Sequence, residues 1–261
     1  MHRRLLSALA LVALGSSPLF AQRVFVSHDE WFLNNGFNAP ASNERRLLTN
    51  ALDWFGVGAG DQVLTWSGNQ IAYVNSPLGS VVTGRGATYT RTTGAVANLS
   101  QYKAIFVGGF AVDNTALINY VLGGGNVVLV GGTCTRLAAG ASCDTNAGQE
   151  AADWQTFLQR FGMGFSSQYN GLATVNTSGF AAQGPFGAAL FTGVGAVYAD
   201  NGNSVLTTIT PPTGVVRQIF NAPSGPGVFG AAVVIPEPST YALLGTGLMV
   251  LVGVARRRRR Q

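Results

Sequence analysis

Two short runs of the sequence, Ala104–Val107 and Val127–Val130, consist entirely of apolar residues. Each run is closed by a pair of glycines and is separated from the other by a segment with helical periodicity. A strand that is apolar at every position must be covered on both faces, which is typical of parallel sheets with helices on either side. This pattern predicts an α/β domain with a mostly parallel sheet.

Three segments carry apolar residues at the spacing of one helical face. Ser42 is expected to cap a helix that runs to Phe55, and Asp113 is expected to cap a helix that stops at Gly123–Gly125. A third helix is predicted over residues 149–161. Helices that alternate with buried strands indicate that both faces of the sheet are covered.

Short β-prone runs begin and end the domain. Val24–Ser27 and Val63–Trp66 are predicted as its first two strands. Near the C-terminus, three further runs are separated by turn residues: Ser204–Ile209, Val215–Phe220 and Val228–Ile235. We expect these three to extend the edge of the sheet in antiparallel fashion.

The last 26 residues have three distinct parts. Pro236-Glu237-Pro238 is followed by the apolar segment Tyr241–Ala255, and a basic cluster ends the chain. The apolar segment has 15 residues and would be about 22 Å long as a helix, so we expect a short transmembrane helix. The cluster resists translocation and predicts a cytoplasmic end; its members are Arg256, Arg257, Arg258, Arg259 and Arg260.

This order of elements resembles the PEP-CTERM tails that exosortase-type transpeptidases recognise in Gram-negative bacteria that produce exopolysaccharide. The resemblance implies cleavage at or near Pro236, Glu237 and Pro238 on the outer face of the inner membrane. It further implies a membrane-anchored precursor, an exosortase as partner, and delivery to the cell surface or extracellular matrix, with exopolysaccharide as a further candidate partner. A plain C-terminal membrane anchor is the alternative.

The N-terminus has the features of a secretory signal peptide. Arg3 and Arg4 precede the apolar run Leu5–Leu14, and Ala21 offers a small residue before the cut. We therefore expect signal peptidase to remove residues 1–21, with an uncleaved anchor as the alternative. The exported domain then spans residues 22–235 and the sorting signal residues 236–261.

The formal charge of +5 comes from the two ends of the chain. Residues 22–235 hold nine of the sixteen basic and ten of the eleven acidic residues, which leaves a net charge of −1. A nucleic-acid footprint requires clustered Lys and Arg side chains. The scattered charges of this domain therefore exclude nucleic acid as a partner.

Cys134 and Cys143 are the two cysteines of the chain. In an exported protein, two cysteines at this separation are expected to form a disulfide, here around a short loop. A reactive Cys134 is the alternative.

The stretch Tyr102–Arg136 resembles the corresponding part of class I glutamine amidotransferase-like folds, with a flavodoxin-like sheet. Those folds have a strand ending in two glycines, a helix, and a strand that leads to a nucleophile turn. The resemblance implies that Cys134 is the nucleophile. However, Arg136 stands where the family has glycine, and His28, the only histidine of the domain, precedes the cysteine. The sequence therefore disfavours a cysteine-dependent amidase.

Ligands of open α/β sheets bind beyond the carboxyl ends of the strands. Three segments are expected to converge there: His28–Glu30, Gly108–Phe110 and Gly131–Cys134. His28 and Asp29 are the catalytic candidates, but the sequence contains no complete catalytic set, and we expect neither a metal site nor a cofactor. The sequence thus favours a non-catalytic binding or structural module. A degenerate or unrecognised hydrolase with a crevice near His28 is the alternative.

Overall fold

The structure is a computed structural model, and it describes residues 22–33, 41–67, 73, 76–109, 112–133, 147–199, 202–207 and 210–235. Gln22–Val234 form one compact unit. The described helices are η1 (Trp31–Leu33), α2 (Asn43–Phe55), α3 (Leu78–Thr83), α4 (Asn114–Leu122), α5 (Ala147–Arg160), η4 (Phe180–Ala182) and α6 (Gly187–Phe191). The described strands are β1 (Gln22–Ser27), β2 (Gln62–Trp66), β3 (Thr88–Thr92), β4 (Ala104–Gly108), β5 (Asn126–Val130), β6 (Met163–Tyr169), β7 (Thr174–Asn176), β8 (Ala196–Tyr198), β9 (Asn203–Thr207), β10 (Val215–Asn221) and β11 (Gly227–Val234).

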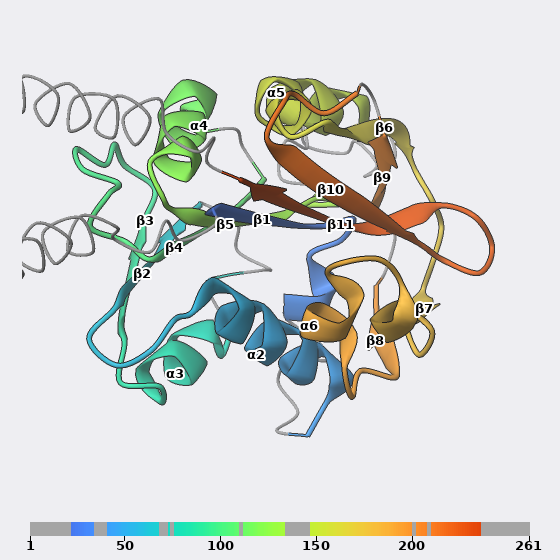
Figure 1. Cartoon of the computed structure of the whole chain (residues 1–261), viewed down its shortest axis with the longest axis horizontal. Coiled ribbons are helices and arrows are strands. Elements are labelled where there is room, and N and C mark those ends of the chain that lie inside the picture. Colours follow the sequence, from blue (N-terminus) through green and yellow to red (C-terminus); the bar gives the residue numbers. More distant parts are fainter. Residues whose placement is uncertain are drawn as a thin grey trace, which may run out of the picture. The chain divides into compact units, whose positions relative to one another are not determined.

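The central sheet has seven strands in the order β10-β11-β1-β5-β4-β2-β3 (Figure 1). Strands β1 to β5 are parallel to their neighbours within this group. Strand β11 runs antiparallel to β1, and β10 runs antiparallel to β11. The predicted mixed α/β fold, with a mostly parallel sheet and an antiparallel C-terminal extension, is confirmed.

The order of the parallel strands departs from the flavodoxin order that the sequence suggested. In that order the first strand lies inside the sheet, between the second and third. Here β1 lies at the end of the parallel group, between β5 and β11. Strand β11 pairs with β1 along its whole length, at the edge where the flavodoxin order has a parallel neighbour.

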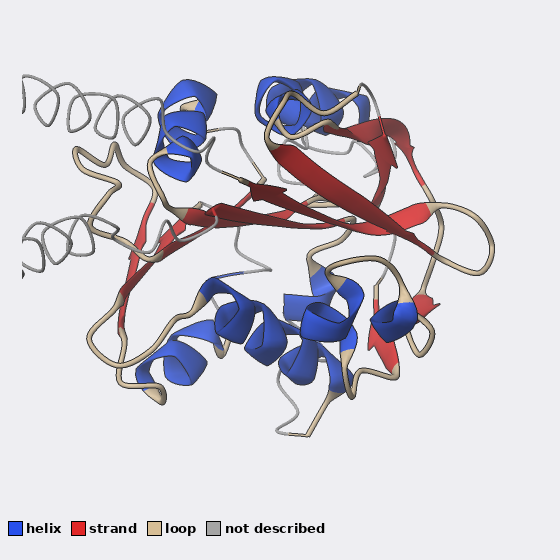
Figure 2. Ribbon diagram, in the orientation of Figure 1, coloured by secondary structure: helices blue, strands red, loops and turns tan. Residues whose placement is uncertain are grey.

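Helices cover both faces of this sheet (Figure 2): α2, α3 and α6 lie on one face, and α4 and α5 lie on the other. Every residue of β4 and β5 is buried, as the two apolar runs predicted. Val24 and Val26 of β1 belong to the core cluster on the α4–α5 face, which includes Trp154. Phe25 points to the opposite face, where its ring stacks on Phe229 with the centroids 5.7 Å apart.

Two side-chain caps start the helices where the sequence predicted. The Ser42 hydroxyl accepts a hydrogen bond from the Arg45 N–H at 3.1 Å, and the Asp113 carboxylate accepts one from the Ala116 N–H at 3.0 Å. Helix α2 ends at Gly56, whose φ of 69° lies in the left-handed region that glycine adopts without strain.

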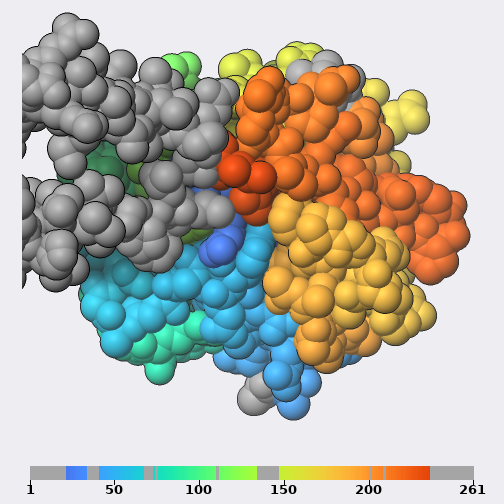
Figure 3. Space-filling view, viewed as in Figure 1, coloured from blue at the N-terminus to red at the C-terminus, as the bar shows by residue number. Residues whose placement is uncertain are grey.

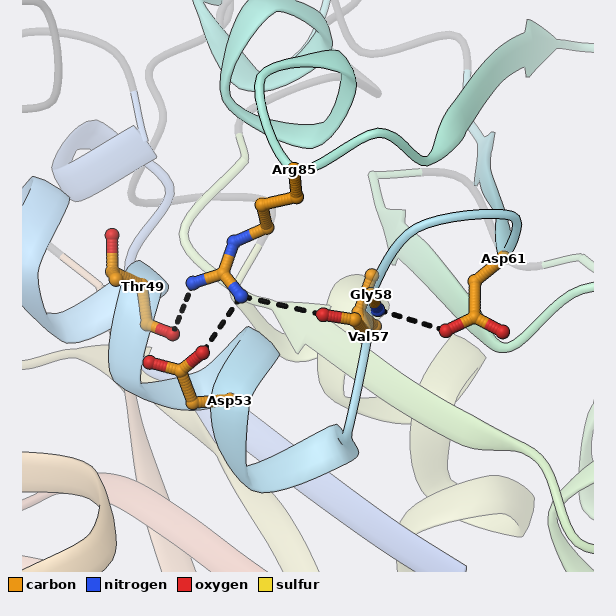
Figure 4. Close-up of polar contacts among 6 residues, drawn as sticks. All are labelled: Thr49, Asp53, Val57, Gly58, Asp61 and Arg85. Atoms are coloured by element: carbon orange, nitrogen blue, oxygen red, sulfur yellow. Dashed lines mark hydrogen bonds and ion pairs between the residues drawn. The ribbon is translucent and has the colours of Figure 1, made fainter.

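The carboxyl end of α2 is held by Arg85 (Figure 4). The guanidinium donates to the Asp53 carboxylate at 2.7 Å, to the Thr49 carbonyl at 3.1 Å and to the Val57 carbonyl at 3.3 Å. A cation at this position complements the partial negative charge of a helix C-terminus. Arg85 thereby fixes α2 to the turn between α3 and β3.

One expected strand lies in a different sheet. Residues 204–209 were expected to extend the main sheet, but β9 pairs with β6 in a separate two-stranded sheet. The edge position is occupied by β10 instead. Gly227 and Gly230 of β11 allow β9 to lie against the face of the main sheet, because a Cβ on Gly227 would meet the Val205 carbonyl oxygen at 2.0 Å.

The segment between β6 and β9 packs against the C-terminal strands. The rings of Phe180 in η4 and Phe191 in α6 lie 5.6 Å and 4.6 Å from the ring of Phe220 in β10. In the space-filling view these segments, coloured yellow-orange and orange, form one continuous surface (Figure 3). The C-terminal half of the domain is thus joined to the sheet by an aromatic cluster.

Several features expected from the sequence lie outside the described residues. These are the leader 1–21, the cysteines Cys134 and Cys143, and the sorting segment 236–261. Within the part of the chain that the structure describes, no helix is both long enough and apolar enough to cross a membrane.

Candidate functional site

The carboxyl ends of β1 and β5 lie side by side and form a candidate crevice. The chain leaves β1 towards α2 on one face of the sheet, and it leaves β5 towards α5 on the other (Figures 1 and 2). Neighbouring strands whose connections leave in opposite directions form the usual ligand-binding crevice of open α/β sheets. His28–Glu30 follow β1 and Gly131–Thr133 follow β5, joined by a bond from the Gly131 N–H to the Ser27 carbonyl at 2.9 Å.

The predicted convergence is therefore confirmed for these two segments. The end of β4 lies next to them, since a Cβ on Gly108 would lie 2.4 Å from the Val130 side chain. Phe110 and Cys134 lie outside the described residues, as does any disulfide of Cys134.

His28 is completely buried in this crevice. Its Nδ1 lies 3.0 Å from the Asn170 Nδ2, and the Asn170 amide is oriented by the Leu172 N–H, which donates to Asn170 Oδ1 at 3.1 Å. Asn170 thus donates to Nδ1, which places the imidazole proton on Nε2. Within the described residues Nε2 has no hydrogen-bond partner. Burial lowers the pKa of His28 to about 3, so the imidazole is neutral at physiological pH.

Asp29 turns the chain out of β1. Its carboxylate accepts a hydrogen bond from the Trp31 N–H at 2.6 Å, and its carbonyl accepts one from the Ser27 hydroxyl at 2.8 Å. This is the local bonding of an Asx-turn. The hydrogen bond to Nδ1 of the His28 ring comes from Asn170.

Glu150, in the first turn of α5, holds the loop after β5. Its carboxylate accepts hydrogen bonds from the Gly132 N–H at 3.0 Å, the Thr133 N–H at 3.2 Å and the Thr133 hydroxyl at 2.6 Å. Burial raises the pKa of Glu150 to about 7, the bonds from Thr133 and Gly132 oppose that rise, and the charge of Asp29 adds to it. The sequence showed Glu150 only as an acidic residue near a helix start.

Asn203 and Gly202 pack against Gly132 and His28, at the ends of β5 and β1. The Asn203 amide accepts from the Gly132 N–H at 3.0 Å and donates to the carbonyls of Ala147 and Ser166 at 3.0 Å and 2.9 Å. Gly202 lies so close to His28 that a Cβ on it would meet the His28 carbonyl oxygen at 1.9 Å. The crevice is therefore occupied by the protein's own backbone and side chains.

The chemistry available at this site is limited. The described residues provide a neutral imidazole and buried carboxyl groups, but the groups of His, Asp and Glu among them do not form a set that would hold a metal ion. The polar contacts connect β1, β5, α5 and β9 to one another. These contacts stabilise the junction of the four elements.

At the opposite ends of the strands, β11 ends at Val234, which pairs with Gln22 at the start of β1. The sequence that continues from this point carries Pro236-Glu237-Pro238 and the arginine cluster. Residues 234–260 match the PEP-CTERM protein-sorting motif. The motif implies processing by an exosortase, with export, a membrane-anchored precursor and then the cell surface as its route.

No curated protein and no solved structure matches this chain significantly. The resemblance of Tyr102–Arg136 to the amidotransferase-like fold therefore has no support from a known structure. The PEP-CTERM motif covers the C-terminal tenth of the chain, and it concerns sorting rather than the chemistry of the domain.

A cavity of about 310 Å³ lies at the amino ends of β2, β4 and β5. It is formed by the turns that precede β2, β4 and β5 and by the end of α4, and its side chains include Asp61, Gln101, Tyr102, Lys103 and Asn119. A volume of this size is at the lower end of the range for small-ligand pockets. The lining offers one cation, one anion and two amides.

The wall formed by Tyr120 is fixed by its surroundings. Its hydroxyl donates to the Tyr102 carbonyl at 3.0 Å and accepts from the Asn126 N–H at 3.2 Å. Its ring lies flat over Gly125, where a Cβ would come within 2.1 Å of the ring. The cavity therefore has a rigid aromatic side between polar walls.

Proposed function

We propose that this protein is exported, processed by an exosortase at its PEP-CTERM motif, and presented at the cell surface or in the extracellular matrix as a non-catalytic binding or structural module. The match of the motif to residues 234–260 carries the proposal. In this scheme signal peptidase removes residues 1–21, and the apolar segment holds the precursor in the inner membrane only until processing.

The non-catalytic role is supported by the filled crevice. His28 and Asp29 are 0% and 1% exposed, and Gly202 and Asn203 occupy the space in which a substrate would have to lie. A hydrolase that uses this crevice would need these segments to separate. Substrate turnover that is lost in His28→Ala would favour that alternative over the module.

Processing is tested on the protein recovered from its native host by intact mass and C-terminal sequencing. We expect a chain that starts near Gln22 and ends at or near residues 236–238. Replacing Pro236-Glu237-Pro238 by three alanines should leave the full C-terminus in place, whereas Ser239→Ala, directly after the motif's polar element, should be processed as the wild type is. Recovery of wild-type protein that still ends at Gln261 would contradict exosortase processing.

We further propose that the cavity at the amino ends of β2, β4 and β5 binds a sugar unit of an extracellular polysaccharide. Amide, hydroxyl and phenol groups line the cavity. A pyranose ring presents hydroxyls that both donate and accept hydrogen bonds, which matches this polar lining. The opposite charges of Lys103 and Asp61 favour a ligand without a large net charge.

Sugar binding is tested by calorimetry with a panel of neutral and acidic oligosaccharides. Because one lost hydrogen bond costs about 1 kcal/mol, Asn119→Ala should weaken binding roughly five- to tenfold. Thr115→Ala, one turn earlier on α4 and outside the lining, is the matched control. If the two variants bound the ligand with equal affinity, the ligand would not bind in this cavity.

A further inference from the structure

The PEP-CTERM motif begins inside the folded domain. Its match starts at residue 234, and Val234 is the last residue of β11. Ile235, half exposed, is the only residue between this strand and Pro236. The point of processing that the motif implies is therefore within a few residues of the sheet.

Strand β11 is an interior strand at this end. Val234 pairs with Gln22 of β1 on one side and with Val215 of β10 on the other, and Val233 pairs with Arg23 and Val216 in the same way. Both hydrogen-bonding edges of the last two strand residues thus face a neighbouring strand. Val233 is also buried, with 9% of its surface exposed.

Enzymes that cut or transfer a peptide bind it as an extended segment, largely through backbone hydrogen bonds to residues on either side of the cut. Such binding requires the segment to be released from its own secondary structure, so cleavage of a folded substrate depends on local opening. A cut near Pro236–Pro238 would require Val233, Val234 and Ile235 on its N-terminal side.

We infer that docking of β11 between β1 and β10 competes with the exosortase for the end of this strand, so that the precursor is processed only while the Gln22–Val234 end of the pair is open. The inference rests on the proposed function, because it assumes that an exosortase acts at the motif. The rate of processing is then set by the opening of one strand end, and a fully docked β11 protects the precursor.

The pairing supplies a direct test. Arg23 and Val233 lie opposite each other in the antiparallel pair, and the Cα separation of either type of antiparallel pair, about 4.5 or 5.5 Å, suits a disulfide. The double variant Arg23→Cys/Val233→Cys closes this strand end when it is oxidised and frees it when it is reduced. The double variant is made in a Cys134→Ser/Cys143→Ser chain, so that the engineered bond is the only disulfide that can form. The same chain in reduced form is the matched control, because it lacks the same contacts of Arg23 with Trp54.

A second variant separates the motif from the sheet. Eight Gly and Ser residues inserted between Ile235 and Pro236 add about 26 Å of extended chain, which gives the enzyme a segment that does not belong to β11. The substrate in each case is the full-length precursor in host membranes that contain the exosortase, and the measurement is the rate at which the C-terminal segment is lost.

We expect processing of the oxidised double variant to be at least tenfold slower than that of its reduced form, and we expect the insertion to restore the rate in the oxidised chain. Equal rates for the oxidised and reduced chains would overturn the inference and leave the proposed function intact. A wild-type precursor that is not processed in these membranes, with or without the insertion, would overturn the proposed function and the inference with it.

Discussion

Acidification from pH 6.5 to pH 3 is expected to remove about 4 kcal/mol of folding stability through His28 alone. The pKa of His28 is about 3 in the folded protein against an ordinary value of 6.5, because the imidazole is fully buried. Between these values the unfolded chain binds the proton and the folded chain does not. The stability that the neutral ring provides is therefore complete above pH 6.5 and is lost as the pH falls towards 3.

Glu150 has the opposite effect over an overlapping pH range. Its pKa is raised by burial from an ordinary 4.5 to about 7, so the folded protein holds this proton more tightly than the unfolded chain does. The stability that it contributes is present below pH 4.5 and is lost as the pH rises through about 7, a change of about 3 kcal/mol. The two groups nearly cancel between pH 4.5 and 6.5, where we expect a plateau of maximum stability.

Urea unfolding at a series of pH values measures both effects. His28→Gln should flatten the rise in stability below pH 4.5. Glu150→Gln should replace the plateau between pH 4.5 and 6.5 by a continued rise, because the slope of His28 is then no longer opposed, and it should remove the fall towards pH 7. The slopes are compared rather than the stabilities, because each substitution also changes the stability that does not depend on pH. Parallel curves for the wild type and His28→Gln between pH 3 and 6 would contradict the burial of a neutral imidazole.

The second large effect is expected from Phe229→Ala. The Phe229 ring is 1% exposed and contacts five other rings at centroid distances of 5.4–6.4 Å, namely those of Phe25, His28, Phe32, Phe180 and Phe191. Removal of a buried phenyl ring costs about 3–5 kcal/mol, since it loses the transfer energy and leaves a cavity. This is a large part of the total stability of about 5–15 kcal/mol of a typical domain.

The effect of Phe229→Ala is measured as the change in the midpoint of urea unfolding at pH 6, on the expected plateau. Val216→Ala on the neighbouring strand β10 is the matched control, because Val216 is 39% exposed and its loss should cost less than 1 kcal/mol. Equal stability of the two variants would contradict the packing of the Phe229 ring among these five rings.

The sequence predicted the central layer because those strands are determined by local composition. Ala104–Val107 and Val127–Val130 have no polar side that water could cover, and Ser42 and Asp113 start helices by hydrogen bonds within their own first turn. The position of β9 followed from glycines elsewhere in the chain. Gly227 and Gly230 permit the close approach of Val205, and no periodicity of the β9 sequence carries that information.

The candidate site was predicted in part for the same reason. The convergence of His28–Glu30 with Gly131–Thr133 follows from the rule for parallel strands. The residues that close the crevice, Glu150 and Asn203, come from later elements and contact the Gly132 N–H across 18 and 71 positions of sequence. Such long-range contacts depend on how α5 and β9 return to the sheet, which a pattern of local residues does not specify.

The pairing of Gln22 with Val234 has a mechanical consequence for a domain that is attached through its C-terminus. A pull along β11 acts on a strand that has a hydrogen-bonded ladder on each side, to β1 and to β10. The force is then applied in shear, so the bonds of both ladders share the load instead of opening one after another. The interior position of β11 would make such an attachment point a part of the sheet that resists tension.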